Sequence, residues 1–409
     1  MRTPAPTLMM KRTAAIVFAV VGLVLLNTAD SRARQSAKPA RYLYVWAGTG
    51  THHESGKNML VVIDVDPASA KYMQVLNVLT VDTAGGMPHH TDLALPPQGP
   101  LFANDYAKDR SYLIDFKDPV NPKLIGRTAS VPGASAMHSF AKLPGGHTLA
   151  TIQYGDSGSK GRPGKLAEFD DKGQLVRYAS SADSTSKDPA IRTYSLTTLP
   201  AIDRVVTTSS PMDSERPANV VQVWRIPDLK LLSTLEVPKT ETDSAWMFPF
   251  EVETLGDGRS VLMNTYYCGF YWITGLDSKP KIERVMVMDQ PKNIGCSVPM
   301  RAGNFMVMPI AYGHRYATID ITDPAHPKEI SSLATDSTFF PHWISGDPGS
   351  DRVVVTDQGD GEPMVRIAHF DKTSGKMKWD DRFKLSFANV SWPNGVKGRV
   401  KPHGAVFVP

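Results

Sequence analysis

The residues with the clearest potential for chemistry are histidines that recur at one position of a repeated strand pattern. Short apolar runs end in Leu-Pro or a similar turn, and one position about six residues earlier stands out. That position is His90, His138, His342 and His403 in four runs, and Tyr194, Phe250 and Cys296 in the other three. The chain has 11 histidines in 409 residues. Seven positions drawn at random would hold about 0.2 histidines, so composition alone does not explain the recurrence.

Several imidazoles that face one point make a ligand set for a transition metal. Imidazole suits copper, zinc and iron, whereas Ca²⁺ and Mg²⁺ prefer oxygen ligands. His89 directly precedes His90. In a regular strand its side chain would point to the opposite face, yet at a strand entrance both can face one site. The predicted metal ligands are therefore His89, His90, His138, His342 and His403.

Other polar residues near this position have two interpretations each. Glu251, one place past Phe250, is the candidate catalytic residue, as a proton acceptor or a group that orients a ligand, or else part of a channel wall. The histidines themselves could instead bond to water trapped in a polar channel. Cys268 and Cys296 form either a disulfide or two buried thiols, and only its position recommends Cys296 as a ligand.

The elements that must bring these positions together are short β-strands. After Gln35, runs rich in Val, Ile, Tyr, Phe and Thr alternate with turns of Gly, Pro, Asp and Asn. Six units of about four runs repeat roughly every 50 residues. A lone strand from His403 and three runs that follow Arg41 supply a seventh unit. We predict an all-β fold, a single seven-bladed β-propeller over residues 41–409, closed by pairing the C-terminal strand with the N-terminal strands.

The order of the blades predicts where the histidines meet. The units that start at His342, His403, His90 and His138 are consecutive in a closed ring, so these side chains should line one arc at one mouth of the channel. Loops between second and third strands should overhang that mouth. These loops are residues 47–58, 154–165, 209–219, 312–315 and 357–363, with His52, His53, Tyr154 and Tyr312 as candidate contacts.

The N-terminus predicts export. Lys11 and Arg12 precede an apolar run over residues 14–26, and Ser31-Arg32-Ala33 resembles a cleavage site. This run is shorter than the ~20 residues of a spanning helix. We predict a signal peptide over residues 1–33, a linker over 34–40, a periplasmic or secreted protein, and no stable membrane insertion after cleavage. The net charge is +4, of which residues 1–33 carry +3, so the rest offers no basic surface for nucleic acid.

These motifs resemble the selenium-binding protein and methanethiol oxidase family. The resemblance rests on Pro88-His89-His90, Met137-His138-Ser139, Pro341-His342-Trp343, Pro402-His403-Gly404 and two Asp-Pro-x-x-Pro-Lys turns. It implies a seven-bladed propeller with a copper cofactor, held by His89, His90, His138 and His403. It also implies oxidation of a small thiol by O₂ in the periplasm, with an aldehyde, sulfide and hydrogen peroxide as products.

Two other functions stay open. A non-haem iron dioxygenase of the carotenoid-oxygenase type also uses four histidines on a seven-bladed propeller, but needs acids around them, for which Glu251 and Asp92 are the candidates. A non-enzymatic propeller that binds a protein or another ligand predicts no stoichiometric metal.

Overall fold

The computed structural model describes residues 38–49, 57–84, 87–106, 110–155, 162–187, 191–212, 218–288 and 295–409. The predicted signal peptide and the loop residues His52 and His53 lie outside these ranges. Strands dominate, and the only helices in the described ranges are single 3₁₀ turns: η2 (Pro200–Ile202), η3 (Phe387–Asn389) and η4 (Pro393–Gly395). None of the helices in the described ranges is long and apolar enough to cross a bilayer.

The strands form seven four-stranded antiparallel sheets, here called blades 1 to 7. Blade 1 is β4 (Pro88–Thr91), β5 (Leu101–Asp105), β6 (Arg110–Asp115) and β7 (Lys123–Arg127). Blade 2 is β8 (Ser135–Lys142), β9 (Thr148–Tyr154), β10 (Lys165–Phe169) and β11 (Leu175–Ser180). Blade 3 is β12 (Leu196–Leu199), β13 (Arg204–Thr208), β14 (Val220–Arg225) and β15 (Lys230–Glu236).

The remaining blades continue around the ring in chain order. Blade 4 is β16 (Pro249–Thr254), β17 (Val261–Thr265), β18 (Gly269–Thr274) and β19 (Lys281–Val287). Blade 5 is β20 (Met300–Ala302), β21 (Phe305–Ile310), β22 (Arg315–Asp320) and β23 (Lys328–Ala334). Blade 6 is β24 (Pro341–Gly346), β25 (Arg352–Asp357), β26 (Met364–Phe370) and β27 (Met377–Ser386). Blade 7 is β28 (Val400–Val408), β1 (Tyr42–Thr49), β2 (Lys57–Asp64) and β3 (Val75–Ala84).

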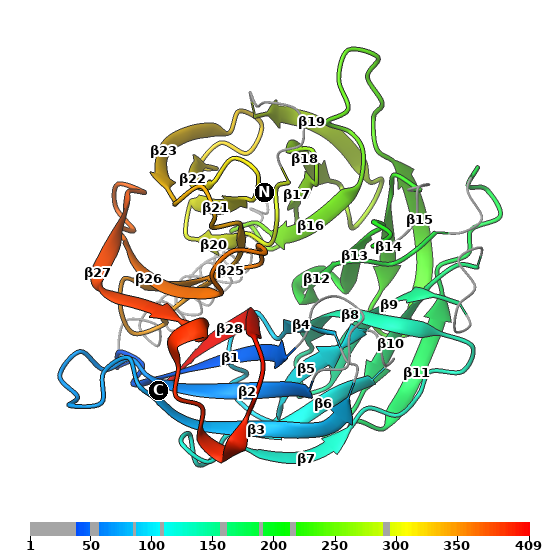
Figure 1. Cartoon of the computed structure of the whole chain (residues 1–409). Coiled ribbons are helices and arrows are strands. Elements are labelled where there is room, and N and C mark those ends of the chain that lie inside the picture. Colours follow the sequence, from blue (N-terminus) through cyan, green and yellow to red (C-terminus); the bar gives the residue numbers. More distant parts are fainter. Residues whose placement is uncertain are drawn as a thin grey trace, which may run out of the picture.

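Blade 7 closes the ring with strands from both ends of the chain. The C-terminal β28 pairs antiparallel with β1, from Tyr42 opposite Val408 to Thr49 opposite Val400. Figure 1 shows the resulting ring, with the fourth strand of each blade on the outer rim. Closure in this way covers the inner edge of β1, which would otherwise lie open. The predicted seven-bladed propeller, including its mode of closure, is confirmed.

Burial follows the position of each strand in its blade. The second and third strands are buried on both faces because they lie between neighbouring sheets, as in β9 and β14. An outer strand such as β11 alternates half-buried and exposed residues, the pattern of a sheet with one solvated face. Buried tryptophans bond across blades: the indole N–H of Trp343 donates to the Ala405 carbonyl at 2.8 Å. The core is therefore a series of inter-blade layers around the channel.

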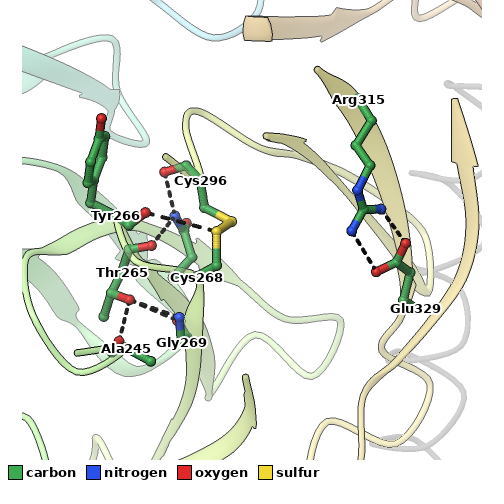
Figure 2. Close-up of a disulfide and its surroundings, with 9 residues drawn as sticks. Ala245, Thr265, Tyr266, Cys268, Gly269, Cys296, Arg315 and Glu329 are labelled. Carbon is green, nitrogen blue, oxygen red and sulfur yellow. Dashed lines mark hydrogen bonds and ion pairs between the residues drawn. A yellow bond between two sulfur atoms is a disulfide. The ribbon is translucent and has the colours of Figure 1, made fainter. Parts of the chain in front are cut away.

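Figure 2 shows that the two cysteines form a disulfide. Cys268 follows β17 in blade 4, Cys296 precedes β20 in blade 5, and their Cα atoms lie 5.2 Å apart. Beside the bridge, the Thr265 hydroxyl donates to the Ala245 carbonyl and accepts from the Gly269 N–H at 2.9 Å. Of the two interpretations that the sequence left open, the structure gives the disulfide, which removes Cys296 from the ligand candidates.

Loss of this disulfide is expected to destabilise the protein. The bridge closes a loop of sequence separation 28. The restriction that it places on the unfolded chain corresponds to a loss of about 3.5 kcal/mol when Cys268 and Cys296 are both replaced by serine. Urea unfolding of the double variant measures the loss, and wild type treated with dithiothreitol should lose the same amount. A double variant as stable as the oxidised wild type would contradict this expectation.

Candidate metal centre

The five predicted histidines converge at the start of the innermost strands. Nε2 of His89 lies 3.0 Å from Nε2 of His138. Ring centroids lie 4.3 Å apart for His90 and His138, 4.2 Å for His89 and His403, and 4.3 Å for His342 and His403. One ring nitrogen each of His89, His90 and His138 lies within 4.8 Å of the other two. All five side chains are buried, so the structure forms one compact imidazole cluster from four blades.

Bulges in the innermost strands direct these side chains into the cluster. The pairing register shifts between Pro88 and Thr91, around His89 and His90, and between Met137 and Phe140, around His138. Blades 6 and 7 show the same shift beside His342 and His403. A bulge re-aims a side chain that regular pleating would turn away. As a result, both members of the pair His89 and His90 enter the cluster, with stacked rings 4.4 Å apart.

A repeated side-chain clamp fixes the backbone at the slot, the position that carries the histidines. In several blades a Thr or Asn on the second strand donates to the slot carbonyl of the next blade. These bonds are Asn104 to His138, Thr151 to Tyr194, Thr208 to Phe250, Asn264 to Cys296 and Thr356 to His403. Asn104 also accepts the His90 N–H, at 2.7 Å. Each clamp sets the distance between neighbouring slots, and so positions the imidazoles before any ligand binds.

Hydrogen bonds set the orientation of individual rings. His138 Nδ1 lies 3.1 Å from the Tyr194 carbonyl, which only accepts, so Nδ1 carries the proton and Nε2 presents its lone pair toward His89. Ser139 Oγ lies near Nδ1 of both His138 and His90, at 2.9 and 3.3 Å. Ser297 Oγ lies 2.6 Å from Nδ1 of His342. Bonds from outer groups of this kind fix the tautomer of a metal-binding histidine.

The environment keeps the imidazoles neutral. Burial, reinforced by the neighbouring His403, His90, His138 and His342, lowers the pKa of His89 well below its ordinary value. Burial likewise lowers the pKa of His138, to about 3, against the opposing effect of its bond to Tyr194. A neutral imidazole is the form that binds a metal.

Two buried nitrogens test whether the cluster suits a metal. Among the described residues, His89 Nδ1 and His90 Nε2 have no hydrogen-bond partner although both are buried. An unpaired buried polar atom is costly, and a cation is one partner that would satisfy it. The candidate ligand atoms are all nitrogens of neutral imidazoles, and hydrogen bonds from surrounding groups orient several of the rings. The residues present therefore fit a transition metal such as copper.

The two acidic candidates are engaged elsewhere. The Glu251 carboxyl group accepts a hydrogen bond from the Ser195 hydroxyl, and burial raises the pKa of Glu251 to about 8. Asp92 accepts the Phe102 N–H at 2.9 Å and lies 3.8 Å from the Lys142 ammonium. The structure thus joins neither carboxylate to a histidine, and the catalytic role of Glu251 stays a prediction.

A cavity of about 720 Å³ opens above the cluster. His89 and His342 form part of its wall, and the rest comes mainly from blades 3 to 6. Loops between second and third strands contribute Ser210 to Met212, Tyr312, and Gln358 to Gly361, as the strand directions predicted. Tyr154 is not among the lining residues, and its hydroxyl lies 3.3 Å from that of Tyr106. The cavity gives a ligand access to the imidazoles.

Several residues of the site were missed at the sequence level. The histidine motifs include Ser139 only as the neighbour of His138, and they do not single out Ser297, although both hydroxyls contact imidazole nitrogens in the structure. The slot alignment is the signal that could have drawn attention to Ser297, because this residue directly follows the slot residue Cys296. The aromatic wall of the cavity, including Phe248, Tyr266 and Phe340, follows no repeat and had no comparable signal.

Comparisons with known proteins give relatives in both sequence and fold. No protein-family model matches the chain. A methanethiol oxidase from Hyphomicrobium sp. is 26% identical over 321 residues, which are 71% of this chain and 70% of that protein. A hypothetical selenium-binding protein from Sulfolobus tokodaii has a TM-score of 0.72 at 15% identity, covering 91% of this chain and 94% of that one.

Another propeller has a similar shape. The periplasmic gluconolactonase of Pseudomonas aeruginosa has a TM-score of 0.63 at 16% identity and covers 90% of this chain and 99% of its own. Identities this low show the fold alone. The match to methanethiol oxidase adds a relation in sequence, so the resemblance drawn from the histidine motifs is confirmed. The chain is thus similar in sequence to a methanethiol oxidase and similar in fold to a selenium-binding protein.

Proposed function

We propose that the protein is a copper-dependent oxidase of a small-molecule thiol. The observation that carries the proposal is the cluster of buried, neutral imidazoles, with nitrogens of His89, His90 and His138 within 4.8 Å of one another. The name of the relative, methanethiol oxidase, supplies the substrate class. The overall reaction consumes a thiol, O₂ and water, and yields an aldehyde, sulfide and hydrogen peroxide.

Each part of the site has a task in this reaction. His89, His90, His138, His342 and His403 would hold the copper. Copper bound there would supply affinity for soft sulfur and electron transfer to O₂. Ser139 and Ser297 keep the rings in the orientation that presents their lone pairs. The cavity admits the thiol to one side of the cluster, and its largely apolar wall limits the water beside the reacting sulfur.

The observed contacts favour this function over an iron dioxygenase. That alternative needs carboxylates around the histidines, and the two candidates, Glu251 and Asp92, bond to Ser195 and Phe102 instead. The hydroxyls of Ser139 and Ser297 and the Tyr194 carbonyl lie within hydrogen-bond distance of ring nitrogens of His90, His138 and His342. We further propose that the protein acts after export to the periplasm, in agreement with its disulfide.

Oxygen consumption tests the activity. The mature protein, without the predicted signal peptide and loaded with copper, should consume O₂ when methanethiol or another alkanethiol is added. It should release hydrogen peroxide and sulfide. His403→Ala should lose this activity, while His326→Ala, which changes an exposed turn histidine, should retain it. Turnover that is equal in both variants, or absent from copper-loaded wild type with every thiol, would overturn the proposal.

Removal of the Ser297 hydroxyl is expected to weaken metal binding without abolishing it. Its contact with Nδ1 of His342 fixes one ring, and loss of such an outer bond lowers metal affinity about 10-fold or somewhat more. Competition with a chromogenic copper chelator measures the change in Kd for Ser297→Ala. Ser331→Ala is the control because Ser331 bonds to Gly375 on the outside of blade 5. Equal affinities in the two variants would refute the orienting role.

A further inference from the structure

The cavity above the histidine cluster has two chemically different walls. One wall is imidazole, from His89 and His342. The other is a run of aromatic rings from blades 3 to 6. Its members are Tyr194, Phe250, Tyr266, Tyr267, Phe248, Tyr312 and Phe340, here called the aromatic wall. The cavity therefore presents metal ligands on one side and apolar ring surfaces on the other.

The aromatic wall is continuous with the metal cluster. Tyr194 packs against His138 with ring centroids 3.9 Å apart, and Phe250 packs against Tyr194 at 4.5 Å. Tyr266 follows Phe250 at 5.7 Å. On the far side, Tyr312 contacts Phe340 at 5.6 Å. Ring-to-ring packing of this kind holds each face in place before a ligand arrives, which reduces the entropy lost on binding.

The cavity is also large for a thiol of one carbon. Its volume of about 720 Å³ lies inside the range of about 300–1,000 Å³ typical of sites for drug-sized ligands. The charged residues in its wall are Asp360 and Lys401, which pair with each other at 2.8 Å. Methanethiol has only two heavy atoms, so it fills a small part of this volume and leaves most of the aromatic wall without a contact. The walls fit a neutral ligand with an apolar, planar body.

We propose that the preferred substrate is an arylmethanethiol, whose sulfur faces the histidines while its ring lies against the aromatic wall. This inference rests on the proposed thiol oxidase function and names its substrate class. The carbon that bears sulfur is oxidised to an aldehyde and O₂ is reduced to hydrogen peroxide. Water supplies the aldehyde oxygen, and the sulfur leaves as hydrogen sulfide. An arylmethanethiol has the CH₂ group that this balance requires, whereas a thiophenol has none.

The test compares phenylmethanethiol with methanethiol as substrates of the copper-loaded full-length protein. Oxygen consumption should give a kcat/KM at least about 10-fold higher for phenylmethanethiol. Tyr312→Ala should raise KM for phenylmethanethiol about 5- to 10-fold, and should affect methanethiol much less because methanethiol has no ring to pack against this tyrosine. Tyr312 is 52% exposed, so its loss should not unfold the protein. Tyr178→Ala, an exposed tyrosine on β11, is the matched control.

A binding measurement separates this inference from the oxidase function. Benzyl methyl sulfide carries the same ring but cannot react as a thiol, and calorimetry can follow its binding to metal-free wild type, Tyr312→Ala and Tyr178→Ala. Binding that weakens only in Tyr312→Ala supports the aromatic subsite, even if no thiol is oxidised and the oxidase function fails. A kcat/KM for methanethiol equal to or above that for phenylmethanethiol, or binding that Tyr312→Ala leaves unchanged, overturns the inference.

Discussion

Replacement of His138 by alanine is expected to reduce the copper content from about one ion per chain to below about 0.1. His138 is the ring whose tautomer the structure determines: Nδ1 donates to the Tyr194 carbonyl and Nε2 points at His89, 3.0 Å away. Loss of this ring removes one ligand and leaves a gap at one end of the arc. Elemental analysis of protein purified from its native compartment measures the copper content.

Two controls separate metal loss from misfolding. His326→Ala removes an exposed histidine bonded to Asp323 in a turn and should keep the full copper content. Circular dichroism of His138→Ala should show the β-sheet signal of the wild type, because the clamps from Asn104 use backbone carbonyls that remain in the variant. A folded His138→Ala protein that still holds one copper per chain would contradict the assignment of this ligand.

The second large effect concerns stability and pH. Glu251 is 5% exposed and burial raises its pKa from the ordinary 4.5 to about 8, with a smaller contribution from Glu253 and an opposing one from the Ser195 bond. The folded state therefore holds a proton that the unfolded state releases above pH 4.5. The stabilisation from this group is fully present below pH 4.5 and is lost as pH rises to about 8.

Glu251→Gln should remove this loss, because glutamine stays neutral. At pH 4.5 the variant and the wild type should unfold at similar denaturant concentrations, and at pH 9 the variant should be more stable by up to about 5 kcal/mol. Glu253, whose pKa burial raises to about 7, titrates in the same range in both proteins. Glu283→Gln changes an exposed residue on β19 and is the control. A stability difference between Glu251→Gln and wild type that does not change with pH would refute the buried protonated carboxyl.

The parts of the fold that the sequence predicted are those governed by local patterns. Each blade repeats the same sequence pattern of strands and turns. The Leu-Pro turns that follow His90 and His138 therefore align the blades, and this alignment assigns histidines that are remote in sequence to equivalent positions in the ring. The lone strand from His403 had to pair with the runs after Arg41, since a propeller with an unpaired strand would keep an open edge. Repeats and edge closure are visible without any coordinates.

The parts that could not be predicted depend on contacts between blades. The alignment assigns Cys296 to the slot. It could not show that the Cα atoms of Cys268 and Cys296 lie 5.2 Å apart and that the two residues form a disulfide. The hydrogen bonds from Thr151 and Asn104 connect neighbouring blades. The residue spacing within a single strand gives no sign of them. The aromatic wall comes from loops and strand starts of several blades, where no period constrains the sequence.

The orientation of the Glu251 side chain is another feature that the sequence could not predict. Its place one residue past the slot predicted a group near the histidines. The bulge between Pro249 and Val252 and the hydrogen bond from Ser195 determine where the carboxyl goes. A bulge adds one residue to a strand without a fixed sequence signature, so the side on which a slot neighbour lies is not encoded locally.

The most direct test of the central claim is anomalous diffraction from crystals of the copper-loaded protein, recorded at the copper absorption edge. We expect one strong anomalous peak among His89, His90, His138, His342 and His403, within bonding distance of ring nitrogens from at least three of them. Disappearance of this peak below the edge would identify the element as copper. A fully loaded crystal whose only copper peaks lie outside the cluster would contradict the account.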